Sequence, residues 1–269
     1  MKDELNCKIT QVVQVSPIMK IFRVAPVGWE LPDFIPGQFV ALFLPPTAER
    51  CEQATEQHKE TAEGKMIKRA YSIASSSKTK EHIEFYITLV HSGALTPRLF
   101  NLKIGDKIGM GTKFVGMFTL KEIPADQNVV LIATGTGVAP YMSMLRTDAM
   151  QRKGKIAVIH GAANSWDLGY SSELTLLESI SPNISYIPTI TEPDKEPGVW
   201  NGEKRFIEPI WKDDVLEKKW GFRPKPENTH VFLCGNPLMT NSMTEIMMGE
   251  GFTEHSRKNP TGQIHVEKF

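Results

Sequence analysis

The second half of the chain alternates short apolar strands with helical segments, and this alternation constrains the fold more than any other feature. Strands are predicted at residues 129–133, 156–160, 184–190 and 231–233. Helices are predicted between and after them, at residues 138–150, 172–180, 206–216 and 238–249. Such alternation predicts an α/β domain with a parallel sheet, whose ligands bind beyond the carboxyl ends of the strands.

The first half of the chain has a different pattern, with short segments rich in β-branched and aromatic residues. Strands are predicted at residues 7–15, 18–24, 39–44, 69–75 and 83–90, with one short helix at about residues 95–101. This pattern predicts a small antiparallel β-barrel, and the polar stretch 45–65 predicts an exposed excursion from it. Because 269 residues suit two domains, we expect a barrel at residues 1–124 and an α/β domain at residues 125–269.

Charge and cysteine content exclude several classes of protein. The 31 basic and 31 acidic residues cancel, so no global field favours nucleic acid. Apolar runs stay shorter than a membrane span, and the first residues lack the pattern of a secretion signal, which predicts a cytoplasmic protein without a membrane span. The three cysteines are far apart and the seven histidines show no ligand spacing, so no metal or iron–sulfur cluster is predicted.

One predicted strand carries side chains suited to a flavin. Residues 69–76 read Arg-Ala-Tyr-Ser-Ile-Ala-Ser-Ser, and on a strand Arg69 and Tyr71 share one face. A planar guanidinium suits a phosphate, an aromatic ring suits stacking on a flavin ring, and the Ser72 hydroxyl suits a ring nitrogen. In isolation, an ordinary edge strand with an extended arginine is the better explanation of these residues, and only the further motifs reverse that preference.

Five further motifs lie before and after this strand. They are Phe-Ile-Pro-Gly-Gln-Phe at residues 34–39, Gly-Ala-Leu-Thr at 93–96, Gly-Thr-Gly-Val-Ala-Pro at 135–140, Leu-Cys-Gly-Asn-Pro-Leu-Met at 233–239 and Val-Glu-Lys-Phe at 266–269. Together with the Arg-x-Tyr-Ser run they resemble the ferredoxin–NADP reductase family along nearly the whole chain. That resemblance implies a flavin-binding barrel followed by a nicotinamide dinucleotide domain, with FAD and either NADP or NAD as cofactors.

The resemblance also assigns roles to individual residues. For FAD it implies binding by Arg69, Ala70, Tyr71, Ser72, Gly93, Leu95, Thr96 and Thr136. For the nicotinamide dinucleotide it implies binding by Gly135, Thr136, Gly137, Pro140, Thr191, Glu192, Lys204, Phe206, Cys234 and Gly235. Hydride transfer itself is expected to involve Ser72, Cys234, Glu267 and Phe269. Each motif alone has a plain alternative, such as an N-capped surface helix, a tight strand-to-helix turn, a small buried thiol or a frayed terminus.

The preferred nicotinamide stays open at this stage. The family places an arginine near the 2′-phosphate of NADP where this chain has Glu192, although Lys204 and Phe206 keep a cation and a ring. A carboxylate about 4 Å from one phosphate charge costs on the order of 4 kcal/mol at an effective dielectric near 20. Glu192 thus favours substantial NADH use, unless it turns into solvent and leaves Lys204 and Arg205 to hold the phosphate.

The resemblance implies an enzyme that passes electrons between NAD(P)H and ferredoxin or flavodoxin. Because such carriers are usually acidic, candidates for a basic docking rim are Lys65, Lys68, Lys78, Lys80 and Arg98. Two alternatives remain: a reductase subunit of an oxygenase or electron-bifurcating complex, and a flavin-binding sensor or assembly subunit without turnover.

Overall fold

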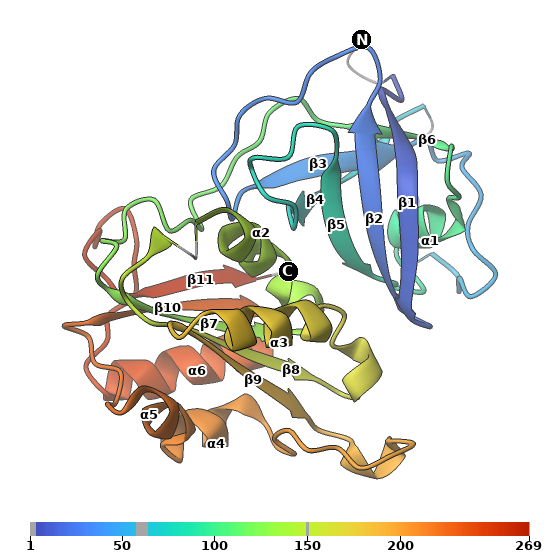
Figure 1. Ribbon diagram of the computed structural model, residues 1–269. Helices are drawn as coiled ribbons and strands as arrows, with labels where there is room; N and C mark the ends of the chain where they lie inside the picture. Colours follow the sequence, from blue (N-terminus) through green and yellow to red (C-terminus); the bar gives the residue numbers. More distant parts are fainter. Residues whose placement is uncertain (1–3, 58–63, 149–150, 269) are drawn as a thin grey trace. The chain divides into compact units, whose positions relative to one another are not determined.

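The computed structural model describes residues 4–57, 64–148 and 151–268 (Figure 1). The chain divides into two compact units, one of Met1–Thr119 with Ala139–Thr147, the other of Leu120–Val138 with Asp148–Phe269. The predicted fold class is confirmed: an antiparallel sheet forms in the first unit and a parallel sheet with helices in the second. The domain boundary between residues 124 and 125 stays a prediction.

The first unit is built on a six-stranded antiparallel sheet. Its strands are β1 (Cys7–Ser16), β2 (Met19–Pro26), β3 (Phe39–Leu44), β4 (Ile67–Ser72), β5 (Ile83–Thr88) and β6 (Lys107–Met110), in the order β4-β3-β6-β1-β2-β5. The helix α1 (Thr96–Asn101) follows β5. Strand β6 was not predicted from the sequence, because four residues with a central glycine, Lys-Ile-Gly-Met, give little strand signal.

The two edge strands of this sheet are joined just beyond the end of β4. Ile73 donates its backbone N–H to Gln38 (3.0 Å), and Ala74 then donates to the Glu84 carbonyl on β5 (2.8 Å). The chain therefore turns from β3 towards β5, which closes the sheet into a barrel. This turn also explains why β4 ends at Ser72, three residues before the predicted end of the strand.

The second unit contains five parallel strands, in the order β11-β10-β7-β8-β9. They are β7 (Asn128–Thr134), β8 (Ile156–Ala162), β9 (Ile184–Ile190), β10 (Thr229–Gly235) and β11 (Ile264–Lys268). The inner strands are buried along nearly their whole length, as both faces of a parallel sheet require. Residues 266–268 of the terminal motif thus lie on an edge strand that the sequence did not predict.

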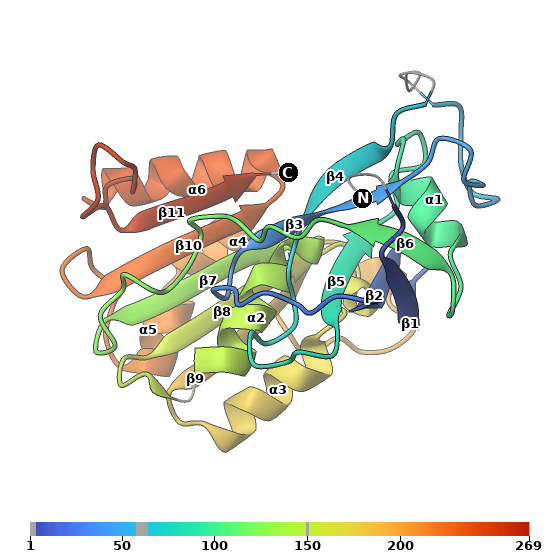
Figure 2. The same cartoon turned by 90° about the horizontal axis from the view of Figure 1, so that it is seen from above.

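The helices in the described part of the chain from residue 135 onward connect these strands. They are η1 (Gly135–Val138), α2 (Ala139–Asp148), η3 (Ser165–Asp167), α3 (Ser171–Ile180), η4 (Pro193–Lys195), α4 (Ile207–Lys212), α5 (Val215–Trp220) and α6 (Pro237–Gly249). A hydrophobic cluster joins one face of the parallel sheet to α4, α5 and α6 through residues such as Ile210, Trp220 and Met243. Figure 2 shows α6 running alongside β10 and β11.

The helix predicted at residues 206–216 is wrong in one respect, because two helices occupy this stretch. Asp214 has a φ of 57°, in the left-handed region that an α-helix cannot include. The helix α4 therefore ends at Lys212, and α5 starts again at Val215 and continues to Trp220.

Among the described residues, no helix combines the length and the apolar composition that crossing a membrane requires.

Candidate functional site

The Arg-x-Tyr-Ser strand β4 lies at the edge of the barrel sheet, paired with β3. Its register sets Arg69 opposite Leu42 and Tyr71 opposite Val40. Because residues directly opposite in an antiparallel pair point to the same face, Arg69 and Tyr71 share the face on which Leu42 and Val40 are buried. The shared face expected from the sequence is therefore confirmed, and the guanidinium reaches solvent while the ring is half-buried.

The ring of Tyr71 is fixed by its neighbours in the barrel. It meets Phe85 edge to face, with ring centroids 6.5 Å apart and planes at 73°. Burial raises the pKa of Tyr71, and the positive charge of Arg69 opposes that rise only in part. Tyr71 therefore stays a neutral, oriented aromatic ring, which is what stacking against a planar ligand requires.

The turn before α1 is organised around Thr96. The Thr96 hydroxyl accepts a hydrogen bond from the backbone N–H of Val90 (3.0 Å) and donates to its carbonyl (3.2 Å). A Cβ on Gly93 would lie 3.0 Å from the Thr96 oxygen, so this position favours glycine. Leu95 is buried at 2% exposure and anchors the turn in the core of the barrel.

Two guanidinium groups lie against this turn. Arg50 donates to the carbonyls of His91 (3.1 Å) and Gly93 (3.4 Å), and Arg98 donates to the carbonyl of Ala94 (2.6 Å). Their charges suit the expected pyrophosphate. Arg50 was missed by sequence reasoning, because it lies in the polar stretch 45–65 and belongs to no motif.

The prediction that Arg98 belongs to a basic docking rim is wrong. Its exposure is 8%, and it also donates to the Pro46 carbonyl (2.8 Å) and the Gln57 side chain (3.1 Å). A guanidinium held inward by carbonyl groups cannot be presented to a partner protein. Lys80 of the same candidate set is exposed and pairs with Asp33 (2.6 Å).

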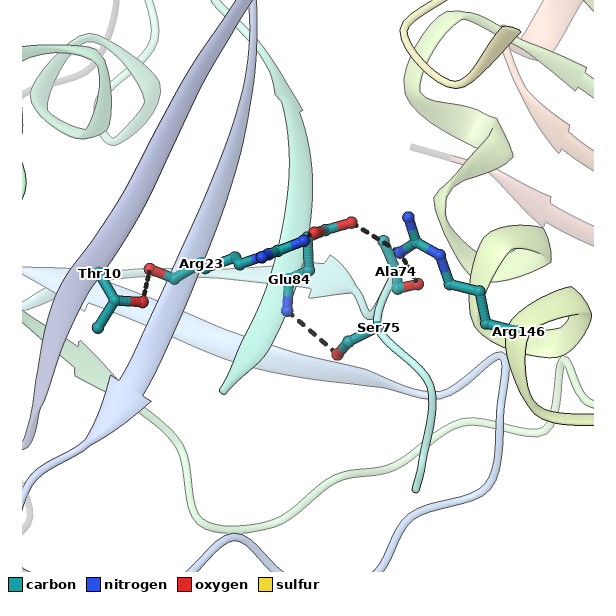
Figure 3. Close-up of polar contacts among 6 residues, drawn as sticks. All are labelled: Thr10, Arg23, Ala74, Ser75, Glu84 and Arg146. Atoms are coloured by element: carbon teal, nitrogen blue, oxygen red, sulfur yellow. Dashed lines mark hydrogen bonds and ion pairs between the residues drawn. The ribbon is translucent and has the colours of Figure 1, made fainter. Parts of the chain in front are cut away.

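A buried carboxylate lies beside the segment that follows β4, within the first unit (Figure 3). Glu84 of β5, 3% exposed, forms ion pairs with Arg23 (2.9 Å) and with Arg146 of α2 (2.7 Å). Arg146 also donates to the Ala74 carbonyl (2.8 Å), and the Ser75 hydroxyl accepts the Glu84 N–H (3.1 Å). The pairs thus hold α2 against residues 74–75, directly after the Arg-x-Tyr-Ser motif.

In the second unit, the glycine motifs meet where the strand order reverses. From β7 the sheet extends to β8 and β9 on one side and to β10 and β11 on the other. Gly135 follows β7 directly and Gly235 is the last residue of β10, so both lie at the carboxyl ends of these neighbouring strands. Sheets of this kind bind their ligands at such a switch point.

The two turns approach each other so closely that side chains are excluded. A Cβ on Gly137 would collide with the carbonyl oxygen of Cys234 and lie 2.8 Å from its carbon. Gly235 has a φ of 129°, and its Cβ would collide with the Thr134 hydroxyl. That hydroxyl accepts the N–H of Asn236 (2.8 Å), which locks the second turn to the end of β7.

Cys234 and Glu267 are brought together by the pairing of β10 with β11. The register sets them opposite each other, and the Cys234 Sγ lies 4.0 Å from a Glu267 carboxylate oxygen. Burial, and to a lesser extent the charge of Glu267, raise the pKa of the Cys234 thiol well above its usual value, so it stays protonated. Phe269, which was also expected to take part in hydride transfer, lies outside the described residues.

The stretch expected near the 2′-phosphate is rich in carboxylates. Glu192 forms an ion pair with Lys195 (2.8 Å), and Glu196 accepts both the N–H (2.7 Å) and the hydroxyl (2.6 Å) of Ser165. Thr191 and Lys204 are exposed.

Arg205 and Phe206 complete this stretch. Arg205 is held by two carboxylates, Glu203 (2.7 Å) and Asp213 (2.6 Å), so its charge is largely compensated. The ring of Phe206 is 68% exposed. This position therefore presents an exposed aromatic ring, as the family resemblance implied; whether the ring contacts the dinucleotide stays a prediction.

Comparisons with known proteins follow the same division of the chain. The family described as "Oxidoreductase FAD-binding domain" matches residues 53–113, and "Oxidoreductase NAD-binding domain" matches residues 131–245. A flavodoxin/ferredoxin–NADP reductase of Buchnera aphidicola subsp. Baizongia pistaciae is 34% identical over 219 residues, which cover 81% of this chain and 86% of the relative. The chain belongs to the flavodoxin/ferredoxin–NADP reductase family.

Other members of the family are similar over most of their length. The ferredoxin–NADP reductase of Azotobacter vinelandii is 28% identical over 216 residues, 77% of this chain and 81% of the relative. A solved ferredoxin–NADP reductase of Neisseria gonorrhoeae, which holds FAD and NADP, superimposes with a TM-score of 0.80 over 98% of this chain and 97% of that one. At 23% sequence identity, this likeness shows a shared fold alone.

The predicted cofactors of the family fit the side chains present here. On the barrel, an exposed guanidinium at Arg69 and an oriented ring at Tyr71 suit the phosphate and the ring system of FAD. On the parallel sheet, the turns of Gly137 and Gly235 pack backbone against backbone at the switch point, which is where sheets of this kind bind a dinucleotide. Which of these residues contact a cofactor stays a prediction.

Proposed function

We propose that this chain is an FAD-dependent oxidoreductase that exchanges a hydride with a nicotinamide dinucleotide and single electrons with ferredoxin or flavodoxin. The observation that carries the proposal is the close packing of the two glycine turns, at Gly137 and Gly235, at the switch point of the parallel sheet. Bound FAD supplies the conversion between one two-electron and two one-electron transfers, which no amino-acid side chain provides.

On the barrel, the residues of β4 bind and orient the flavin. Arg69 pairs with a flavin phosphate, and Tyr71 offers a flat neutral wall kept in place by Phe85. Ser72 provides a hydroxyl near the reacting edge, with Ala70 beside it on the same strand. Arg50 and Arg98 place positive charge at the turn of Gly93 to Thr96, which we assign to the pyrophosphate.

On the parallel sheet, the residues bind and orient the nicotinamide. Gly135, Thr136 and Gly137 provide a turn that a pyrophosphate can approach closely, and Pro140 stands early in α2, where its missing N–H costs nothing. The protonated thiol of Cys234 gives a small neutral surface for the nicotinamide ring. Glu267, beside it, stabilises positive charge or holds a proton.

The electron carrier is ferredoxin or flavodoxin, proteins that the names of the relatives specify. Lys65, Lys68 and Lys78 are exposed in the first unit, where β4 lies, and can attract an acidic carrier. Their attraction should weaken as the salt concentration rises, because exposed charges are screened.

Anaerobic titration of the purified protein tests the proposal. We expect NADH or NADPH to bleach the flavin absorbance, and added oxidised ferredoxin or flavodoxin to restore it. A preparation that cannot be loaded with FAD, or a yellow protein whose flavin no nicotinamide reduces, would contradict the proposal. The second outcome would favour a sensor or assembly subunit instead.

The carboxylates around Glu192 support substantial use of NADH. Because Lys195 and Arg205 are already paired with carboxylates, Lys204 is left as the exposed cation of this stretch without an ion pair among the described residues. A 2′-phosphate would meet more negative than positive charge here. The two hydroxyls of an NAD ribose carry no such penalty and can donate to a carboxylate.

The variant Glu192→Arg is expected to shift the enzyme towards NADPH. Reversing this charge should raise the ratio of kcat/KM for NADPH to that for NADH by about tenfold or more, even after solvent screening of the exposed site. Steady-state kinetics with both nucleotides measure the ratio. The matched control is Glu122→Arg, the same charge reversal at an exposed position outside this cluster, which should leave the ratio unchanged. Equal ratios in both variants would count against the role of Glu192.

A further inference from the structure

A fully buried histidine lies beneath the first glycine turn. His160 is the fifth residue of β8 and has no exposed surface. Its Nε2 lies 2.9 Å from the carbonyl oxygen of Gly135, the residue at which β7 gives way to η1. No motif of the chain includes His160, and the function described above gives it no role.

The protonation state of His160 follows from its partner. A carbonyl oxygen can only accept, so the ring must carry its proton on Nε2 and donate it to Gly135. Nδ1 then has a lone pair, and within the described part of the chain it has no hydrogen-bond partner although it is buried. Burial lowers the pKa of His160 to about 4, only partly opposed by the bond to Gly135, so the ring is neutral at physiological pH.

The bond fixes one peptide plane of the turn. In a trans peptide the carbonyl of Gly135 and the N–H of Thr136 point in opposite directions. Holding the carbonyl inward against His160 therefore turns the Thr136 N–H away from the buried side of the turn. Gly135 has a φ of 53° and, as a glycine, has little intrinsic preference for this conformation, so the orientation needs an external constraint.

We propose that His160 is a positioning residue that sets the Gly135–Thr136 peptide in the orientation required to bind the dinucleotide pyrophosphate. The proposal rests on the function proposed above. The second turn has a corresponding anchor, because the Thr134 hydroxyl holds the N–H of Asn236 at 2.8 Å. Each of the two turns at the switch point is thus held from the sheet by one buried or half-buried side chain.

Replacing His160 by leucine removes the donor and keeps an apolar side chain of similar size. We expect the dissociation constants of NADH and NADPH, measured by flavin or nicotinamide absorbance, to rise about tenfold, the usual value of one hydrogen bond. Because the chemical step is untouched, kcat at saturating nicotinamide should change by less than about threefold. His160→Gln places an amide N–H near the same point and should restore most of the affinity.

A structural control separates positioning from stability. Val158→Ala creates a cavity in the same buried strand and should lower the melting temperature while leaving nicotinamide affinity intact. If His160→Leu does not fold, His160→Met fills the space without a donor and should show the same loss. Because His160 stays neutral above about pH 5, its protonation should not affect nicotinamide binding near pH 6.5. The wild-type protein and His160→Gln should therefore show the same pH dependence of affinity in this range.

The outcomes distinguish the two proposals. Wild-type protein that binds FAD but neither nicotinamide would overturn the proposed function itself. Wild-type protein that binds a nicotinamide, with His160→Leu or His160→Met binding it within twofold, would overturn the role of His160 alone. Equal losses in Val158→Ala and His160→Leu would also overturn it, because a weakened sheet would then explain the effect.

Discussion

Replacing Glu84 by alanine is expected to lower the free energy of unfolding of the flavin-binding unit by about 3 kcal/mol. The carboxylate is 3% exposed and faces two guanidinium groups, so its removal leaves Arg23 and Arg146 without their shared counter-ion. The Arg23 side chain is 41% exposed and can turn to water, which keeps the loss near the lower end for a buried ion pair. Most of the cost falls on Arg146, which is 20% exposed.

The measurement is urea unfolding of the flavin-loaded chain, followed by circular dichroism and by flavin fluorescence. Glu81→Ala, at an exposed position just before β5, is the control and should change stability by no more than about 0.5 kcal/mol. The double variant Glu84→Ala/Arg146→Met removes the Arg146 charge together with its counter-ion. Its loss in free energy of unfolding should therefore be at least about 1 kcal/mol smaller than the sum of the losses in the two single variants. Strict additivity would show that the two side chains do not act together.

The fold was largely predictable from the sequence. The residue types along a strand reflect which of its faces are buried, so most strands could be located from their composition. The bounds of β3 and β9 were predicted without error, since each is a run of mainly apolar residues bordered by clear turns. Elements without such a run were missed or merged. Strand β6 has a glycine at its centre, and the break between α4 and α5 depends on the backbone of Asp214, which hydrophobic periodicity does not report.

The candidate site was predictable where motifs repeat a known order, and not where contacts join distant residues. Glu84 carried a signal, because a carboxylate between Ile83 and Phe85 in an apolar strand needs a buried partner. Its partner Arg146 is 62 positions away and could not be chosen from the sequence. His160 gave no signal, since a histidine at the end of an apolar strand is common.

Replacing Gly137 by alanine is expected to reduce kcat/KM for both nicotinamides by about 100-fold or more while the protein keeps its flavin. The new Cβ would collide with the Cys234 carbonyl oxygen and lie 3.1 Å from the Gly235 Cα, both of them backbone atoms that no side-chain rotation can move. Normal contact needs roughly 3.4 Å or more, so the two turns must separate by an appreciable fraction of an ångström. Stopped-flow reduction of the flavin by NADH and NADPH measures the effect.

The loss should appear in both binding and the chemical step, because Gly137 touches the backbone of Cys234 itself. Pushing Cys234 outward shifts the thiol and its contact with Glu267, so the nicotinamide is held in the wrong place as well as more weakly. Gly198→Ala is the matched control, since a Cβ there meets nothing within 4 Å and its φ lies outside the left-handed region. If Gly137→Ala kept the affinity and rate of Gly198→Ala, the pyrophosphate could not lie against these two turns, and another part of the sheet would have to bind the nucleotide.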